Sequence, residues 1–345
     1  MKLIAAKFGG SSTATAGRFR QILEIVRASP ERRCVVLSAP GATEEGGEKI
    51  TALLERCRQA RAAGRDPAPL IDAVAARYAG IARELGVCFP PGEVSREIEA
   101  ALEVSDAHTM SRGEALCARL FSRWSGMPML DAAGLVRFDA SGALNVPATL
   151  RGFARVRGMP RLIVPGFYGA DRQGRIHTLP RNGSDVTGAL AAAGIGADVY
   201  ENWSDVPGLM SADPAIVPDA RPIPRVGYRQ MRLLAEAGAR ILHPDALAPV
   251  EAAGIPTRLR STLQPDAPGT VIDGDFSETV PCAAAKDLSE SLSQVTVFGL
   301  PHDQRGSLES AISPLMSAGE RDILRLVVPR ARRDQALRAA HGFLP

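Results

Sequence analysis

Short apolar runs and stretches of helical spacing alternate along the first two thirds of the chain. The apolar runs suit buried strands, and the stretches between them repeat apolar residues every three or four positions. Strands are predicted at residues 2–6, 34–38, 161–165 and 198–203, and helices at residues 18–27, 48–63, 70–85 and 186–193. Helices between strands predict an α/β fold with a mostly parallel sheet, whose functional site lies at the carboxyl ends of the strands.

The pattern changes after residue 272. Residues 273–281 have the composition of a linker, and strand and helix spacing then alternate again. The predicted elements are a strand at 294–300, a helix at 307–316, a strand at 323–328 and a helix at 332–343. The chain is therefore predicted to contain a large domain over residues 1–272, and a linker with a small α+β module over residues 273–345.

Composition is typical of a soluble globular protein, with 45% hydrophobic and 23% charged residues among 345. The net charge of +3, without a basic run interleaved with aromatic residues, argues against a nucleic-acid partner. No apolar stretch reaches the length of a membrane span, and the first strand is too short for a signal peptide, so no membrane association is expected. Five scattered cysteines without a Cys-x-x-Cys pair predict reduced thiols in the cytoplasm.

One segment, residues 177–185, concentrates polar chemistry just before a predicted helix. The start of a helix presents free backbone N–H groups and a positive dipole end, which suit a bound anion. Arg181 adds a fork for a carboxylate or phosphate, and Asp185 adds a negative group that orients an ammonium or a metal ion. Taken alone, the segment is more typical of an ordinary helix cap.

A second polar segment follows the first predicted strand. Lys7 stands at the strand end, ahead of Gly9, Gly10 and Ser11, in an arrangement that suits a turn around phosphate. The alternative is a tight turn with an ordinary solvated lysine. Only four of the 41 basic residues are lysines, which favours a specific use for this one. Ser38 stands at the end of the second predicted strand, as a shared site requires.

Five segments, taken in this order, resemble the aspartokinase family over most of the chain, from about Lys2 to Ile272. They are Lys-Phe-Gly-Gly-Ser-Ser at 7–12, Arg-Asn-Gly-Ser-Asp at 181–185, Trp-Ser-Asp-Val-Pro-Gly-Leu-Met-Ser-Ala-Asp-Pro at 203–214, Gly-Ala-Arg-Ile-Leu-His-Pro at 238–244 and Arg-Leu-Arg-Ser-Thr at 258–262. The resemblance implies an amino-acid-kinase sandwich of helix, sheet and helix. It also implies transfer of the ATP γ-phosphoryl group to the side-chain carboxylate of L-aspartate, which gives 4-phospho-L-aspartate.

The resemblance assigns residues to three parts of a site. In the catalytic part, Lys7 bridges the transferred phosphoryl group, and Asp185 holds Lys7 or the Mg²⁺ ion that ATP carries. In the acceptor part, Arg181 grips the α-carboxylate of the substrate and Glu114 is associated with its amino group. The other acceptor residues are Ser38, Ala39, Thr43 and Ser184. The nucleotide residues are Gly9, Gly10, Ser11, Ser204, Asp205, Met210, Asp213 and Arg240.

Several of these residues also have ordinary interpretations. Outside the resemblance, Glu114 is a solvated carboxylate on a helix face, and Ser38 and Thr43 are turn residues. Gly41 and the acidic pair at residues 44–45 are equally typical of a mobile lid and of a plain surface loop.

The sequence departs from the family pattern mainly on the nucleotide side. Met210 stands where a tyrosine is usual, Ala215 where a phosphate-contacting arginine is frequent, and Arg240 where a lysine is usual. Asn182 replaces a glycine, which matters if the backbone there needs a positive φ, a conformation that asparagine tolerates. Two alternatives follow: a relative that acts on another amino acid or acyl acceptor in a specialised pathway, and a catalytically impaired regulatory subunit.

Residues 273–345 resemble a single abbreviated ACT module, where aspartokinases usually carry two. No strand is expected between the helix at 307–316 and the strand at 323–328, because Gly319 to Arg321 leaves no room for one. We expect a packing or dimerisation remnant rather than an effector site. A homodimer is predicted, because the core of so small a module is poorly covered in a monomer.

Overall fold

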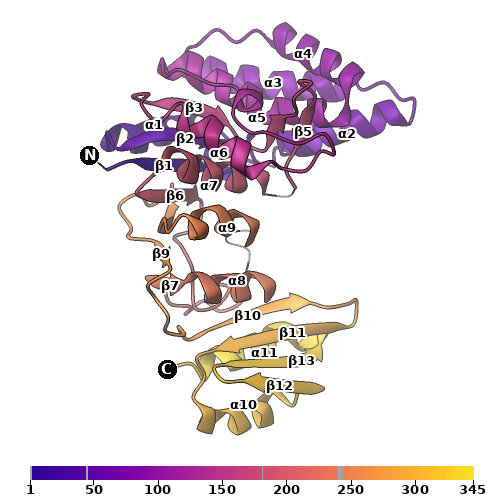
Figure 1. The fold of residues 1–345 in the computed structure, drawn as a ribbon. Helices are drawn as coiled ribbons and strands as arrows, with labels where there is room; N and C mark the ends of the chain where they lie inside the picture. The colour runs from indigo at the N-terminus through magenta and orange to yellow at the C-terminus, as the bar shows by residue number, and fades with distance from the viewer. Residues whose placement is uncertain (1, 44–45, 181, 240–241, 243) are drawn as a thin grey trace.

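The computed structural model describes residues 2–43, 46–180, 182–239, 242 and 244–345. Figure 1 shows a large N-terminal part, in indigo to orange, joined to a smaller C-terminal sheet in orange to yellow. The larger part is built on a seven-stranded sheet, and the smaller part on a four-stranded sheet.

The main sheet is mostly parallel, which confirms the predicted fold class. Its strand order is β3-β2-β1-β6-β8-β9-β7, and only the pair β8-β9 is antiparallel. The strands are β1 (Ile4–Phe8), β2 (Arg32–Leu37), β3 (Leu162–Pro165), β6 (Val199–Ser204), β7 (Arg225–Gly227), β8 (Thr257–Ser261) and β9 (Thr270–Asp273). A short hairpin of β4 (Tyr168–Ala170) and β5 (Ile176–Thr178) stands apart.

Helices cover both faces of this sheet. Successive strand residues point to opposite faces, and the strands are buried along most of their length, so both faces need cover. On one face, Phe8, Phe19 and Trp203 belong to a core with α1 (Ala16–Ala28), α2 (Ile50–Ala62), α3 (Ala68–Leu85), α4 (Pro91–Val104) and α5 (Asp106–Ser125). On the other, Ala5 and Tyr200 belong to a core with α6 (Val146–Ala154), α7 (Gly183–Ile195), α8 (Tyr228–Glu236) and α9 (Pro244–Ala252). Two short 3₁₀ turns, η1 (Ser11–Thr13) and η2 (Ala132–Gly134), lie in loops.

The C-terminal module is an antiparallel sheet with two helices, in the strand order β10-β11-β13-β12. Its elements are β10 (Cys282–Asp287), β11 (Leu292–Phe298), η3 (His302–Gln304), α10 (Arg305–Ile312), β12 (Met316–Glu320), β13 (Ile323–Pro329), η4 (Arg330–Arg332) and α11 (Arg333–Gly342). This arrangement fits an ACT-like region.

The expectation that no strand follows the first helix of the module is wrong. Helix α10 ends at Ile312, four residues earlier than predicted, and Met316–Glu320 then forms β12. The strand escapes detection because all five of its side chains are exposed, so it has no apolar alternation, and its backbone pairs with β13. Strand β10 was also not predicted.

Residues 209–223 contribute to the cores of both parts. Leu209 and Ile223 are buried in the core of the main sheet, whereas Ala212 and Val217 are buried in the core of the C-terminal module. Between them, the Ser211 hydroxyl lies 2.8 Å from Nε2 of His341, in α11. This segment therefore belongs structurally to both parts of the chain.

Among the described helices, none has the length and apolar character needed to cross a lipid bilayer.

A buried group of charges lies beneath β1 and β6. The Glu201 carboxylate accepts hydrogen bonds from Nε of Arg32 at 2.6 Å and from the indole N–H of Trp203 at 3.0 Å. Arg260 approaches the same carboxylate at 3.6 Å. The two guanidinium groups lie over the Trp203 ring, 5.3 and 4.6 Å from its centroid for Arg32 and Arg260. One carboxylate thus compensates two arginines.

We predict that Glu201→Ala lowers the free energy of unfolding by about 3–5 kcal/mol, because it leaves a buried guanidinium without its counterion. Urea denaturation measures the loss. Glu48→Ala is the matched control, since Glu48 pairs with Arg56 on the exposed surface, where such pairs contribute about 0–1 kcal/mol. A Glu201→Ala loss no larger than that of the control would contradict the prediction.

Candidate active site

The Lys7 ammonium and the Asp185 carboxylate form a buried ion pair, with Nζ 2.5 Å from Oδ1. Lys7 lies near the carboxyl end of β1, and Asp185 lies in the first turn of α7. The Asn202 side chain donates to the same carboxylate oxygen at 2.9 Å. The Tyr200 hydroxyl donates to the Asp185 backbone carbonyl at 3.1 Å. Sequence reasoning missed Asn202, although a buried amide in a strand beside β1 is the signal that could have found it.

The glycine turn after β1 is held from both sides. Gly9 donates its N–H to the carbonyl of Trp203 at 3.0 Å, so the Gly9 amide is already engaged within the protein. Gly41 donates to the Gly10 carbonyl at 2.8 Å. A Cβ atom on Gly41 would lie 2.7 Å from the Gly10 carbonyl carbon, so this contact requires a glycine. Ser11 opens the 3₁₀ turn η1 that continues the segment.

The loop after β2 lies against this turn. Ser38 and Ala39 are buried directly beyond the strand end, which is the position predicted for Ser38. The Thr43 hydroxyl accepts a hydrogen bond from the Gly47 N–H at 2.9 Å. Arg77 donates to the Gly41 carbonyl at 3.0 Å, which anchors the loop to α3. The acidic pair at residues 44–45 lies outside the described residues.

Glu114 is buried on α5, so its interpretation as a solvated carboxylate is wrong. Its Oε2 atom has no hydrogen-bond partner among the described residues. Burial raises the pKa of Glu114 to about 8, against the opposing effects of backbone N–H groups at Ala39 and Glu114 and of the Lys7 charge. The Glu114 carboxyl is therefore mostly protonated at neutral pH.

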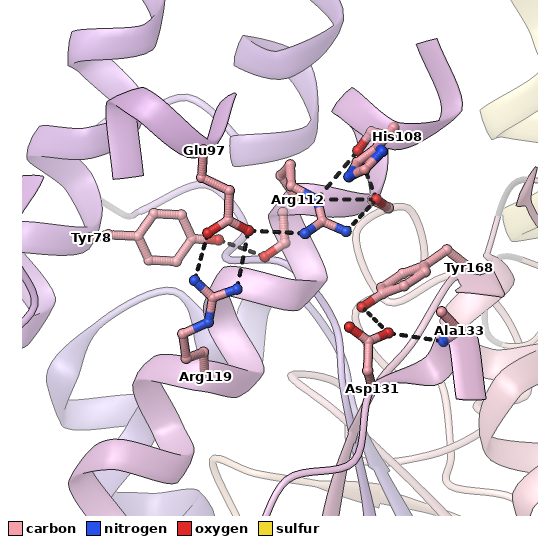
Figure 2. Close-up of polar contacts among 10 residues, drawn as sticks. Tyr78, Glu97, His108, Arg112, Arg119, Asp131, Ala133 and Tyr168 are labelled. Atoms are coloured by element: carbon pink, nitrogen blue, oxygen red, sulfur yellow. Dashed lines mark hydrogen bonds and ion pairs between the residues drawn. The ribbon is translucent and has the colours of Figure 1, made fainter. Parts of the chain in front are cut away.

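A polar network fixes α5, the helix that carries Glu114. Figure 2 shows the Glu97 carboxylate between the guanidinium groups of Arg112 and Arg119. The shortest distance from a guanidinium nitrogen to a Glu97 oxygen is 2.9 Å for Arg112 and 2.5 Å for Arg119. The Tyr78 hydroxyl donates to the carbonyl of Gly113 at 2.6 Å. Because this bond is formed one residue before Glu114, it holds the turn of α5 that carries Glu114.

The predicted anion-binding segment does lead into a helix, α7. Arg181 itself lies outside the described residues. Asn182 has φ 62° and ψ 25°, so the left-handed backbone that would explain an asparagine here is present. Ser184 is buried in the first turn of α7. Its side chain packs against Gly166, at the end of β3, where a Cβ atom would lie 2.6 Å from the serine hydroxyl oxygen.

The nucleotide-side residues are more widely spread. Ser204 ends β6, and Asp205 is exposed in the turn that follows. Met210 forms an isolated bridge with Pro222, and the exposed Asp213 accepts a hydrogen bond from the N–H of residue 215 at 2.9 Å. Arg240 lies outside the described residues. The structure therefore brings Lys7, Asp185 and the glycine turn together, whereas Met210 and Asp213 lie in the segment that both cores share.

Comparison with known proteins identifies the family of the chain. Residues 2–261 match the model of the amino acid kinase family. Aspartokinase 3 of Bacillus subtilis is 34% identical over 289 residues, which is 78% of this chain and 63% of that protein. The aspartokinase of Corynebacterium efficiens is 32% identical over 331 residues, which is 92% of this chain and 69% of that protein. The chain belongs to the amino acid kinase family and, within it, to the aspartokinases.

Solved structures share the fold. Aspartate kinase from Clostridium acetobutylicum superposes with a TM-score of 0.89 at 24% identity, over 99% of this chain and 100% of that one. Escherichia coli aspartokinase III in complex with aspartate and ADP gives a TM-score of 0.70 at 23% identity, over 99% of this chain and 84% of that one. The chain spans 63% of the length of the Bacillus subtilis relative and of a Rickettsia prowazekii aspartokinase.

Proposed function

We propose that the protein is an aspartate kinase, which transfers the γ-phosphoryl group of ATP to the side-chain carboxylate of L-aspartate. The observation that carries the proposal is the buried Lys7–Asp185 pair beside the glycine turn at the carboxyl ends of β1 and β6. A buried ammonium held at a strand end is suited to a transferred phosphoryl group. The names of the relatives support aspartate as the acceptor.

The reaction requires two anions to meet, so positioning and charge compensation dominate. The acceptor carboxylate is already ionised at neutral pH and needs no general base. One of its oxygens attacks the γ-phosphorus, the bond from that phosphorus to the β–γ bridging oxygen breaks, and ADP leaves. Lys7 compensates the charge on the transferred group, and Asp185 with Asn202 keeps the ammonium in place.

For the acceptor, we assign Arg181 to the α-carboxylate and Glu114 to the α-ammonium. Glu114 suits that role because its unpartnered carboxylate oxygen is buried and gains an ionic partner when an ammonium binds. The residues assigned to the walls of the acceptor site are Ser38, Ala39, Thr43 and Ser184.

For the nucleotide, we assign the residues that line the ends of β1 and β6 and the segment beyond them. These are Gly9, Gly10, Ser11, Ser204, Asp205, Met210, Asp213 and Arg240. Mg²⁺ bound with ATP would neutralise phosphate charge, and Asp185 is the carboxylate beside the turn that fits it. Proteins commonly hold Mg²⁺ through one or two carboxylates together with phosphate oxygens. No cluster of three or more His, Cys, Asp or Glu in the described part of the chain could hold a metal ion.

Lys7→Ala should lower hydroxamate formation from Mg-ATP, L-aspartate and hydroxylamine about 10²- to 10³-fold, because a preorganised charge on the transferred group is lost. Hydroxylamine traps the acyl phosphate, so the assay reports the product itself. Lys286→Ala, in the C-terminal module, is the matched control and should keep its rate. No hydroxamate from the folded wild-type protein would refute aspartate kinase activity.

Binding of L-aspartate at pH 7 should release close to one proton. The pKa of free Glu114 is raised to about 8, so the carboxyl is mostly protonated at pH 7, and a bound ammonium favours the ionised form. Affinity for L-aspartate should therefore increase as the pH rises from 6 to 8. Calorimetry in buffers of different ionisation enthalpy measures the proton count.

Glu114→Gln should abolish this proton release and flatten the pH dependence, whereas Glu103→Gln, at an exposed position of α4, should change neither. Wild-type binding without proton release would rule out the ammonium-binding role of Glu114.

We also propose a cytoplasmic homodimer. All five cysteines are free, as expected for a reducing compartment. Strand β12 lies at one edge of its sheet. Its first residue, Met316, and the preceding Leu315 are 69% and 61% exposed. An exposed strand edge with apolar side chains favours pairing with another chain. Sedimentation at micromolar concentration should give a dimer, and a monomer would overturn the proposal.

A further inference from the structure

The segment at residues 258–262 has no role in the site described so far. It comprises most of β8 and the residue after it. Strand β8 lies directly beside β6, and Ser261 pairs with Ser204 in the parallel ladder. Thr262 follows as the first residue beyond the strand and is 1% exposed. The segment therefore ends against the turn that carries Ser204 and Asp205.

The Thr262 hydroxyl connects two parts of the site that come from distant segments. Its oxygen donates to the Ser204 carbonyl at 2.9 Å and lies 3.1 Å from the Ser12 hydroxyl. A hydroxyl has one proton to donate. Because Thr262 gives its proton to Ser204, Ser12 is the donor in the second bond. The Thr262 backbone N–H also reaches the Ser204 carbonyl, at 2.7 Å.

Ser12 belongs to the glycine turn after β1. It is fully buried, and its N–H donates to the Gly9 carbonyl at 3.0 Å. The N–H of Gly9 in turn donates to Trp203, the residue before Ser204. The end of β6 thus holds the glycine turn directly at Gly9, and Thr262 closes a second connection through Ser12.

Arg260 stabilises the strand that presents Thr262. Its guanidinium lies 4.6 Å from the centroid of the Trp203 ring and 3.6 Å from the Glu201 carboxylate. It also donates to the Pro265 carbonyl at 2.6 Å, which ties down the loop after Thr262. Arg260 therefore holds both the strand before Thr262 and the loop after it.

We propose that Thr262 is a positioning residue, which locks the phosphate-binding glycine turn to the nucleotide-binding Ser204 turn. This inference rests on the proposed nucleotide site. Thr262 acts through Ser12 and Ser204. Without its hydroxyl the connection through Ser12 is lost, whereas the Gly9–Trp203 hydrogen bond remains. The spacing of the phosphate and nucleoside contacts is then less well defined.

The test is Thr262→Val, which keeps the shape of the side chain and removes the hydroxyl. Loss of one hydrogen bond predicts a rise of about three- to tenfold in the Kd for Mg-ATP by calorimetry, and in the KM for Mg-ATP. The KM for L-aspartate should stay within about twofold. Thr262→Ser should retain wild-type values, because it restores the hydroxyl. Thr257→Val makes the same change at the opposite end of β8 and is the matched control.

Ser12→Ala removes the other partner and supplies an independent route if Thr262→Val folds poorly. It should raise the Kd for Mg-ATP as Thr262→Val does, and the double variant should bind no more weakly than the worse single variant. If wild-type protein binds Mg-ATP and both single variants match it, the positioning role is refuted while the proposed function stands. If folded wild-type protein fails to bind Mg-ATP, both are refuted.

Discussion

The parallel pairing of β1 with β6 is the constraint on which the rest of the molecule depends. It places Lys7 opposite Asn202 on one face of the sheet, and Phe8 opposite Trp203 on the other. Each face then carries a buried charge pair: Lys7 with Asp185 above, and Arg32 with Glu201 below. Because buried charges need their partners, a slip of one residue in this pairing would leave several charges uncompensated. The chemistry of the site and the stability of the sheet therefore depend on the same register.

Residue patterns, together with the family resemblance, predicted part of this arrangement. An apolar strand that ends in Lys7 and a glycine pair, and an acidic residue at a helix start, marked two separate polar segments. That Asp185 holds Lys7 was implied by the resemblance to aspartokinases. The strand ends also placed Ser38 at the same edge of the sheet. These features are local in sequence, so periodicity and turn chemistry are sufficient to detect them.

Other features depend on contacts between distant segments and were beyond prediction. The burial of Glu114 depends on how α5 packs against the loop at Ala39, and the spacing within a helix does not report such packing. The hydroxyl contact between Ser12 and Thr262 spans 250 positions. Strand β12 was missed for a different reason: its residues face solvent, and its backbone pairing with β13 has no signature in the side chains.

The segment between Leu209 and Ile223 has a consequence for how the molecule comes apart. Its ends are buried in one core, whereas Ala212 and Val217, in its middle, are buried in the other. Melting either core would strip apolar side chains of this segment from their partners and weaken its hold on the other core. The two sheets are thereby coupled into one cooperative unit of unfolding, although they share no strand.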